Sequence, residues 1–268
     1  MTRTRLLAAT AALAIIGSSV MLACSDSTNP TSQIRYGATL PFAQGTARTF
    51  VELDASGAPS ALGIALTEGG LSGLPATSST PSPTALMVTL PLPAEASGIG
   101  FDHAELGWNP QGHEPPQLYG QPHFDAHFYM VSQATQMAIL PNDPQFAAKA
   151  ANFPVADLVP ATYVPPPGVA AASAIPQMGL HWSSINSPEL TGHPFTSTLI
   201  FGSWDGKFIF VEPMVTKAFL ETHPNATTSI PQPARWSSAG RYPTTYTVSY
   251  DASAKEYHFV LGGLTKRP

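Results

Sequence analysis

Three of the eight histidines lie close together in the middle of the chain, and two carboxylates, Glu114 and Asp125, accompany them. Imidazole and carboxylate groups are the ligands that zinc, iron and manganese commonly take in proteins. Two further candidate ligands are His181, in Gly-Leu-His-Trp, and Glu212, in a later apolar segment. We interpret these residues as a candidate metal site: His113, His123, Asp125, His127, His181 and Glu212.

The spacing of the residues in 122–131 leaves two arrangements open. In a strand, His123, Asp125 and His127 share one face, and the other face is apolar: Phe124, Ala126, Phe128 and Met130. The two histidines would then lie about 13 Å apart, too far to share an ion, although each could act with Asp125. In a helix they would lie one turn apart and could chelate one ion together. The aromatic content favours the strand.

Glu212 follows the strongest hairpin signal in the chain, Asp205-Gly206, which predicts strands over 198–204 and 207–213. A two-residue turn predicts the pairs Trp204–Lys207, Phe201–Phe210 and Leu199–Glu212. Glu212 would then share a face with four apolar residues: Leu199, Phe201, Phe208 and Phe210. A carboxylate on such a face is costly unless a cation, a metal or a hydrogen-bond donor meets it.

Two interpretations of the site remain open. A metal held by His113, His123 or His127, His181 and Glu212, with Asp125 orienting a histidine, would bring a bound water and hydrolytic or oxidative chemistry to a small molecule. Metal capture or sensing without turnover is a narrower form of this interpretation. In the other, the protein is a non-catalytic envelope protein that binds a ligand or partner, or is structural, and these side chains form a structural network. Three other histidines have no candidate ligands close by in the sequence, and we expect them at the surface: His103, His223 and His258.

Composition predicts how these residues are positioned. The chain has 28 prolines and only 11% charged residues, which favours short strands joined by proline-rich loops over long helices. We expect one mainly β domain, a sandwich or a barrel, over residues 35–268. The remaining elements are expected as strands at 47–54, 85–90, 246–250 and 256–261, short helices within 66–74, 132–139 and 143–151, and a long surface connection at 155–177. With a net charge of −5 and no basic run, a nucleic-acid partner is not expected.

The N-terminal residues have the parts of an export signal. Residues 1–23 combine two early arginines with an apolar run that is short for a membrane span, and Cys24 follows in a sequence that resembles a lipobox. Cys24 is the only cysteine, so no intrachain disulfide can form. We expect a lipoprotein signal peptide over 1–23 and a lipid anchor with a polar tether over 24–34. That predicts a protein tethered to a membrane, in the periplasm, on the outer membrane or on the cell surface. The alternative is an ordinary secretory signal with an incidental cysteine.

Four segments carry a family resemblance: Trp-Asn-Pro-Gln-Gly-His at 108–113, Pro-His-Phe-Asp-Ala-His-Phe-Tyr-Met at 122–130, Met-Gly-Leu-His-Trp at 178–182, and 195–214. With these segments the chain resembles a family of exported bacterial proteins of unknown function. The family is typified by a Thermus protein under extracytoplasmic stress control through sigma and anti-sigma factors. The resemblance extends over about residues 35–262 and implies one domain. It implies no activity, and assembly into homo-oligomers is a further expectation.

Overall fold

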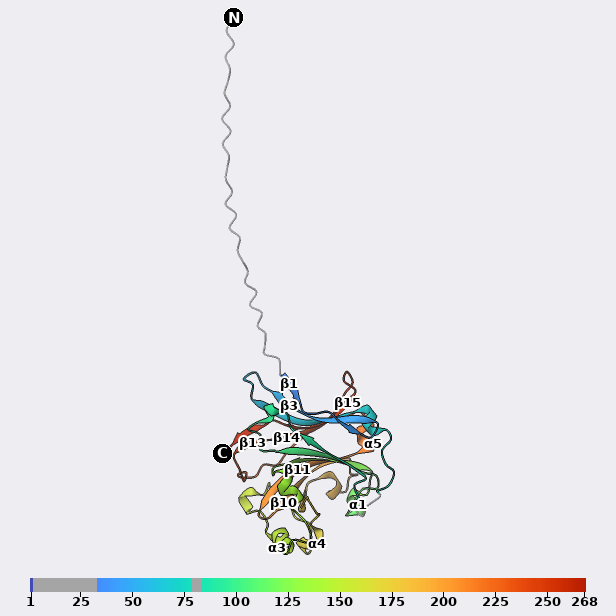
Figure 1. The fold of residues 1–268 in the computed structure, drawn as a ribbon, viewed down its shortest axis with the longest axis vertical. Coiled ribbons are helices and arrows are strands. Elements are labelled where there is room, and N and C mark those ends of the chain that lie inside the picture. The colour runs from blue at the N-terminus through green and yellow to red at the C-terminus, as the bar shows by residue number, and fades with distance from the viewer. Residues whose placement is uncertain (2–32, 79–82) are drawn as a thin grey trace.

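Two antiparallel β-sheets lie face to face and enclose the main apolar core (Figure 1). The computed structural model describes Met1 and residues 33–78 and 83–268. The expected signal peptide, Cys24 and nearly all of the tether therefore lie outside the described residues. No helix in the described part of the chain is long and apolar enough to cross a membrane.

The first sheet has the strand order β1-β3-β4-β15-β14-β12, with β2 paired to β3, and the second has the order β5-β6-β7-β11-β10-β9-β8. The strands of the first sheet are β1 (Gln33–Tyr36), β2 (Leu40–Phe42), β3 (Gly45–Leu53), β4 (Pro59–Thr67), β12 (Asn225–Ser229), β14 (Thr245–Asp251) and β15 (Glu256–Gly262). Those of the second are β5 (Leu86–Pro91), β6 (His103–Asn109), β7 (His123–Tyr129), β8 (Tyr163–Val164), β9 (Leu180–Ser184), β10 (Ser197–Trp204) and β11 (Lys207–Thr216). A separate ribbon pairs β13 (Gly240–Tyr242) with β16 (Thr265–Arg267).

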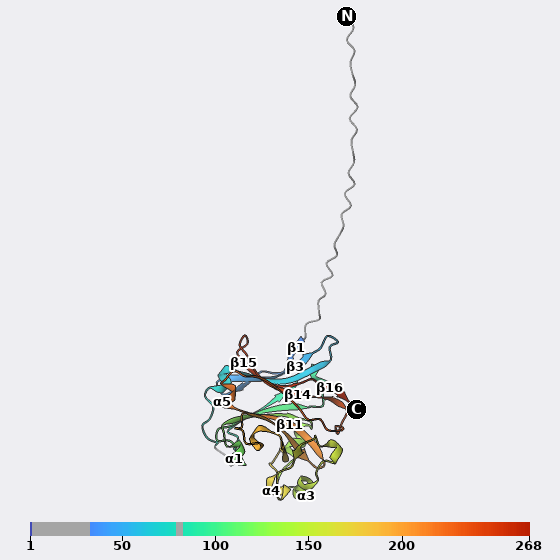
Figure 2. The ribbon, with the colours of Figure 1, turned by 180° about the vertical axis from the view of Figure 1, so that it is seen from behind.

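Helices are few and short. They are α1 (Pro116–Tyr119), α2 (Gln133–Met137), α3 (Phe146–Ala151), α4 (Ala170–Ser173) and α5 (Lys217–Leu220). Four 3₁₀ turns are η1 (Glu68–Leu71), η2 (Ala94–Ala96), η3 (Ala156–Leu158) and η4 (Pro188–Leu190). Both views show α3 and α4 beyond the second sheet, on the side away from the first sheet (Figures 1 and 2). The second sheet therefore has a core face toward the first sheet and an outer face toward these connections.

The core between the sheets is built from alternate residues of facing strands. Phe124 of β7 lies with its ring centroid 6.2 Å from that of Phe42 and 6.5 Å from that of Phe259, both in the first sheet. Leu62, Ile64 and Leu66 of β4 belong to the same cluster and are fully buried. The mainly β prediction is confirmed, and the form is a sandwich, because neither sheet closes on itself in the described residues.

The local predictions are largely confirmed. The expected helices at 132–139 and 143–151 are α2 and α3, and the second hairpin is β14 with β15. The connection over 155–177 carries only η3, β8 and α4. The short helix expected within 66–74 is the four-residue 3₁₀ helix η1, because β4 continues to Thr67 and leaves no room for a longer one.

The register of the first hairpin departs from the prediction. Trp204 pairs with Lys207 as expected, but Phe201 pairs with Val211 rather than Phe210, and Leu199 pairs with Pro213 rather than Glu212. The cause is a β-bulge, in which Ser203 pairs with Phe208 and Gly202 with Phe210, so that β11 contains one extra residue.

The bulge reverses the face of every later side chain in β11. Phe208 belongs to the core between the sheets, whereas Phe210 belongs to a separate cluster on the outer face. Glu212 therefore shares its face with Phe210 and not with Phe201 or Phe208. The expectation that Glu212 shares a face with Leu199, Phe201 and Phe208 is wrong, and the carboxylate lies with Phe210 on the outer face of the second sheet.

Gly202→Ala tests the close packing at the bulge. A Cβ at this position would clash with Cε1 of Phe210, whereas one at Gly107 would meet two side-chain methyl groups, that of Met87 at 3.1 Å and that of Thr84 at 3.3 Å. We expect Gly202→Ala to lower the free energy of unfolding by about 1–3 kcal/mol. Gly107→Ala, the control, should change it by less than about 1 kcal/mol. Urea unfolding measures both, and equal effects would contradict this account of the bulge.

Candidate metal centre

The segment that carries the central histidines is the strand β7. Phe124, Ala126 and Phe128 lie in the main core, so His123, Asp125 and His127 lie on the outer face. The helical alternative for this segment is wrong. The neighbouring strand β6 adds polar residues to the same face, because its Asn109 pairs with His123 and its Glu105 pairs with His127.

The next strand brings Glu212 to this face. Val211 pairs with Phe128 and Met214 with Asp125, a register that places Glu212 opposite His127. His181 of β9 reaches the face from two strands away, by pairing with Gly202 of β10. The six predicted residues thus lie on one side of one sheet, and they form two groups rather than one. Each group is a triad whose ligand atoms lie within 4.8 Å of one another.

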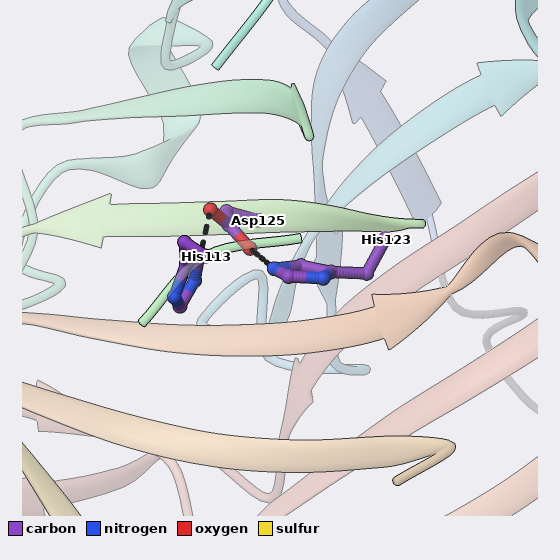
Figure 3. Close-up of side chains that lie close together, drawn as sticks. All are labelled: His113, His123 and Asp125. Atoms are coloured by element: carbon purple, nitrogen blue, oxygen red, sulfur yellow. Dashed lines mark ion pairs between the residues drawn. The ribbon is translucent and has the colours of Figure 1, made fainter. Parts of the chain in front are cut away.

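The first triad consists of His113, His123 and Asp125 (Figure 3). His113 lies in the loop between β6 and α1, and the other two lie on β7. Nε2 of His123 is 3.1 Å from Oδ1 of Asp125, and Nε2 of His113 is 3.9 Å from Oδ2. His123 is fully buried and Asp125 nearly so, whereas 22% of the His113 side chain is exposed.

Hydrogen bonds orient both imidazoles of the first triad. Nδ1 of His123 donates to the carbonyl of Gln121 at 2.6 Å, and Nδ1 of His113 donates to the carbonyl of Glu114 at 2.9 Å. Since a carbonyl only accepts, each Nδ1 carries a proton and each Nε2 is directed toward Asp125. This is the arrangement typical of metal-bound histidines, whose second nitrogen is held by a carbonyl or carboxylate.

Asp125 is also held in place. The amide of Asn109 donates to Oδ2 of Asp125 at 2.5 Å, and its own carbonyl accepts from Thr84 at 2.9 Å. Oδ1 of Asp125 and Nε2 of His123 approach closely but lack the alignment of a hydrogen bond, and neither has another partner among the described residues. A buried lone pair this close to a carboxylate oxygen requires a cation between them, which is either a proton or a metal ion.

The charges of the first triad favour an ion pair. Burial alone would lower the pKa of His123, but the negative charge of Asp125 and the hydrogen bonding of the ring to Asp125 and Gln121 together outweigh it and raise the pKa above the usual value. Burial alone would raise the pKa of Asp125, but His123 and, more weakly, His113 and His127 hold it well below its usual range. In the absence of a metal, a proton on His123 therefore occupies the position between Nε2 and Oδ1.

The second triad consists of His127, His181 and Glu212. Nε2 of His127 lies 3.5 Å from Oε1 of Glu212, and Nε2 of His181 lies 3.6 Å from Oε2. His127 and Glu212 are buried, and 25% of the His181 side chain is exposed. The Phe210 ring packs edge-on against both imidazoles, with centroids 4.9 Å from His127 and 5.3 Å from His181. The bulge that turns Phe210 outward thus also orients this triad.

The second triad is poor in hydrogen bonds and electrically neutral. Both ring nitrogens of His127 and Oε2 of Glu212 have no partner among the described residues. Burial raises the pKa of Glu212 well above its usual value, and Asp125 adds to this. Burial also lowers the pKa of His127, and lowers that of His181 to about 3. Without a metal, burial therefore favours the neutral form of the Glu212 carboxyl and of both imidazoles.

Sequence reasoning missed a neighbouring network on the same face. His103, expected at the surface, is buried, and its Nε2 lies 2.9 Å from Oε1 of Gln136. The amide of Gln136 donates to Glu105 at 2.9 Å, and Glu105 also accepts from Thr89. The alternation of His103, Glu105 and Asn109 in β6 is the signal that places them on one face. His223 is exposed as expected, and His258 is partly buried.

Comparison with known proteins gives one match. Residues 54–108 match the family model described as TTHB210-like, hypothetical protein TTHB210. This supports the resemblance to the Thermus-typified family over β4, β5 and β6, which is well under half of the chain. The segments that suggested the resemblance begin where the match ends, and all six candidate ligands lie beyond it. No curated protein and no solved structure matches the chain.

Glu212→Gln tests the protonation state of the second triad in the metal-free protein. The folded-state pKa of Glu212 lies above its usual value of 4.5, so the folded state binds more protons than the unfolded state in that window. Wild-type stability therefore falls as pH rises above about 4.5. The glutamine side chain of the variant cannot ionise, and the histidine contributions are common to both proteins. We expect the variant to gain stability relative to wild type between pH 5 and 8 in chelator-treated samples, measured by urea unfolding. A difference that stays constant with pH would contradict the raised pKa.

Proposed function

We propose that the outer face of the second sheet binds a divalent transition metal, zinc, iron or manganese, and that the protein uses it on a small molecule. Each triad offers two imidazoles and one carboxylate, a donor set that these metals take with coordination positions left open. Binding at each triad is part of the proposal.

One observation carries this proposal. Three ligand atoms of the second triad are buried without a hydrogen-bond partner in the described residues: His127 Nδ1, His127 Nε2 and Glu212 Oε2. In the first triad, His123 Nε2 and Asp125 Oδ1 face each other at 3.1 Å, and a metal ion would replace the proton between them. Buried polar atoms in native proteins are nearly always paired, because leaving one unpaired costs about 1–3 kcal/mol. A cation within the second triad would satisfy two of its three atoms, leaving only His127 Nδ1, since each imidazole binds through one nitrogen.

The geometry suits catalysis at a bound metal as well as metal binding without turnover. His113 and His181 are each about one-quarter exposed, so each triad has one side open to small molecules. A bound divalent metal supplies a Lewis acid and an activated water at neutral pH. The chain's own contribution is orientation, through the backbone carbonyls that hold His113 and His123 and through Asn109, which holds Asp125.

A second candidate is a non-catalytic envelope protein whose polar face is structural. It is favoured by the neighbouring Glu105, Gln136 and His103, which satisfy one another by hydrogen bonds on the same face. On this view the triads are extensions of that network. Replacing their members would lower thermal stability, and no metal would be found.

The proposal includes a place of action outside the cytoplasm. The leader at 1–23, the lone Cys24 and the polar residues after it support a lipid anchor on a membrane facing the periplasm or the cell exterior. Residues 33–36 form β1, so the anchor and the folded domain would be separated only by the short polar tether.

Metal analysis of the protein purified without chelator tests the proposal. After supplementation with zinc, iron, manganese and copper, we expect up to two bound ions per chain. His123→Ala should remove the ion of the first triad, and Glu212→Gln should weaken the second site by at least about tenfold, because a neutral amide replaces a carboxylate ligand. His223→Ala, an exposed histidine outside both triads, is the matched control and should bind like wild type. No bound metal in supplemented wild type would remove the proposal in favour of the structural alternative.

Burial raises the pKa of Glu212 well above its usual value, so metal binding to the second triad competes with a proton on that carboxyl. We expect proton release on titration with Zn²⁺ and an affinity that rises with pH, because the proton on Glu212 competes with the metal, whereas burial lowers the pKa of both imidazoles of this triad. Calorimetry in buffers of different ionisation enthalpy counts the protons. Glu212→Gln should release fewer protons than wild type, and an equal number would contradict the assignment of the carboxyl as a ligand.

A further inference from the structure

One nitrogen of the second triad would remain unpaired even with an ion in place. Nδ1 and Nε2 of His127 are both buried and have no hydrogen-bond partner among the described residues. Nε2 lies 3.5 Å from Oε1 of Glu212, so it is the nitrogen that faces the triad. Nδ1 would then carry the proton of the neutral ring and would need an acceptor. In the first triad, backbone carbonyls are the acceptors for both imidazoles.

The fold places a buried carboxylate, that of Glu105, directly opposite His127. The two residues pair across β6 and β7, and both side chains lie on the outer face of the second sheet. Residues directly opposite each other in antiparallel strands have Cβ atoms about 4.5–5.5 Å apart, so their side chains are within reach of each other. Both residues are buried. Glu105 is therefore the acidic side chain that the strand register brings to this ring from β6.

Glu105 is held in place, but its charge is not balanced. Oε1 accepts a hydrogen bond from the hydroxyl of Thr89 at 3.1 Å, and Oε2 accepts one from the amide of Gln136 at 2.9 Å. Both donors are neutral, and the nearby His103 ring bonds Gln136 and Asp102 rather than Glu105. Each carboxylate oxygen can accept a second hydrogen bond. A buried carboxylate without a cationic partner gains most from a donor that carries positive charge, and a metal-bound imidazole is such a donor.

The charge of Glu105 already acts on the ring. Burial lowers the pKa of His127, and the negative charges of Asp125 and Glu105 both act in the opposite direction. The ring itself is fixed by its aromatic neighbours, because Tyr129 stacks on it at 5.6 Å between centroids and Phe210 packs edge-on at 4.9 Å. The remaining adjustment therefore falls to the Glu105 side chain, whose three side-chain bonds can rotate.

We propose that Glu105 is a positioning residue of the second triad, whose carboxylate accepts the Nδ1 proton of His127 and so directs the lone pair of Nε2 toward Glu212. This inference rests on the proposed metal function. Since Nδ1 is unpaired in the structure, the hydrogen bond forms on metal binding, when an ion on Nε2 makes the Nδ1–H group a stronger donor. A carboxylate in this role fixes the tautomer and orientation of a ligand histidine and raises its basicity.

The ring proton of His127 gives the most direct test. In zinc-loaded wild type, nitrogen-15 NMR should show His127 protonated at Nδ1, with a proton resonance shifted downfield by the carboxylate. In Glu105→Gln that resonance should move upfield, because an amide oxygen is a weaker acceptor than a carboxylate. Glu189→Gln, the same substitution at a buried glutamate outside both triads, is the control and should leave it in place. Protonation at Nε2, which needs no variant to detect, or an Nδ1 resonance that Glu105→Gln does not move, would overturn the proposal.

Zinc titration separates positioning from charge. In His123→Ala, which lacks the first site, we expect Glu105→Gln to weaken zinc binding by about 10–100-fold and Glu189→Gln to leave it within about twofold. In Glu212→Gln, where the first triad binds zinc more tightly than the second, Glu105→Gln should change the affinity by less than about threefold. Equal losses on both backgrounds would mean that Glu105 acts through its charge alone, and would overturn the positioning role.

The outcomes for this inference and for metal binding are distinguishable. If wild type binds no zinc, the metal proposal fails, and the tautomer of His127 in the chelator-treated protein still tests Glu105: a proton on Nδ1 supports the role, and one on Nε2 overturns it. Conversely, zinc bound to His127 through Nδ1, with the proton on Nε2, would sustain the metal proposal and overturn this one.

Discussion

The extra residue in β11 determines which side chains the second sheet presents to each side. Before the bulge, Phe208 faces the first sheet, and after it Val211 and Val215 continue the core while Phe210 and Glu212 face outward. Without that residue, Glu212 would enter the apolar core between the sheets, where nothing could meet its charge. The bulge therefore both completes the core and supplies the carboxylate of the second triad.

Much of this arrangement is readable from local sequence. The alternation of apolar and polar residues in β7 is sufficient to predict its two faces, and Asp205-Gly206 is sufficient to predict the hairpin turn. Glu212 also has close polar neighbours, as expected for a buried carboxyl group, since His127 and His181 lie 3.5 and 3.6 Å from its oxygens.

Other features depend on information that residue types do not carry. The bulge lies in Phe208-Ile-Phe-Val211, where every residue is apolar. Shifting the strand register by one residue therefore does not change the alternation of apolar and polar residues that the sequence shows. His181 approaches Glu212 only because β9 pairs with β10, and strand order is a property of the whole sheet. His113 reaches Asp125 from a loop whose path the sequence does not specify. The division of six candidate ligands into two triads follows from these non-local contacts.

The two triads have the same ligands but different electrostatics, and the reason is their surroundings. In the first, backbone carbonyls hold both imidazoles and an amide donates to Asp125, so the carboxylate stays ionised despite burial. In the second, no hydrogen-bond donor among the described residues meets Oε2 of Glu212, and the nearby charge of Asp125 disfavours a second negative charge on the same face. One ionised and one protonated carboxyl on neighbouring strands is the charge distribution that minimises repulsion in a buried site. A cation at the first triad would partly neutralise Asp125 and so lower the cost of ionising Glu212. The electrostatic interaction between Asp125 and Glu212 would therefore couple metal binding at the two triads.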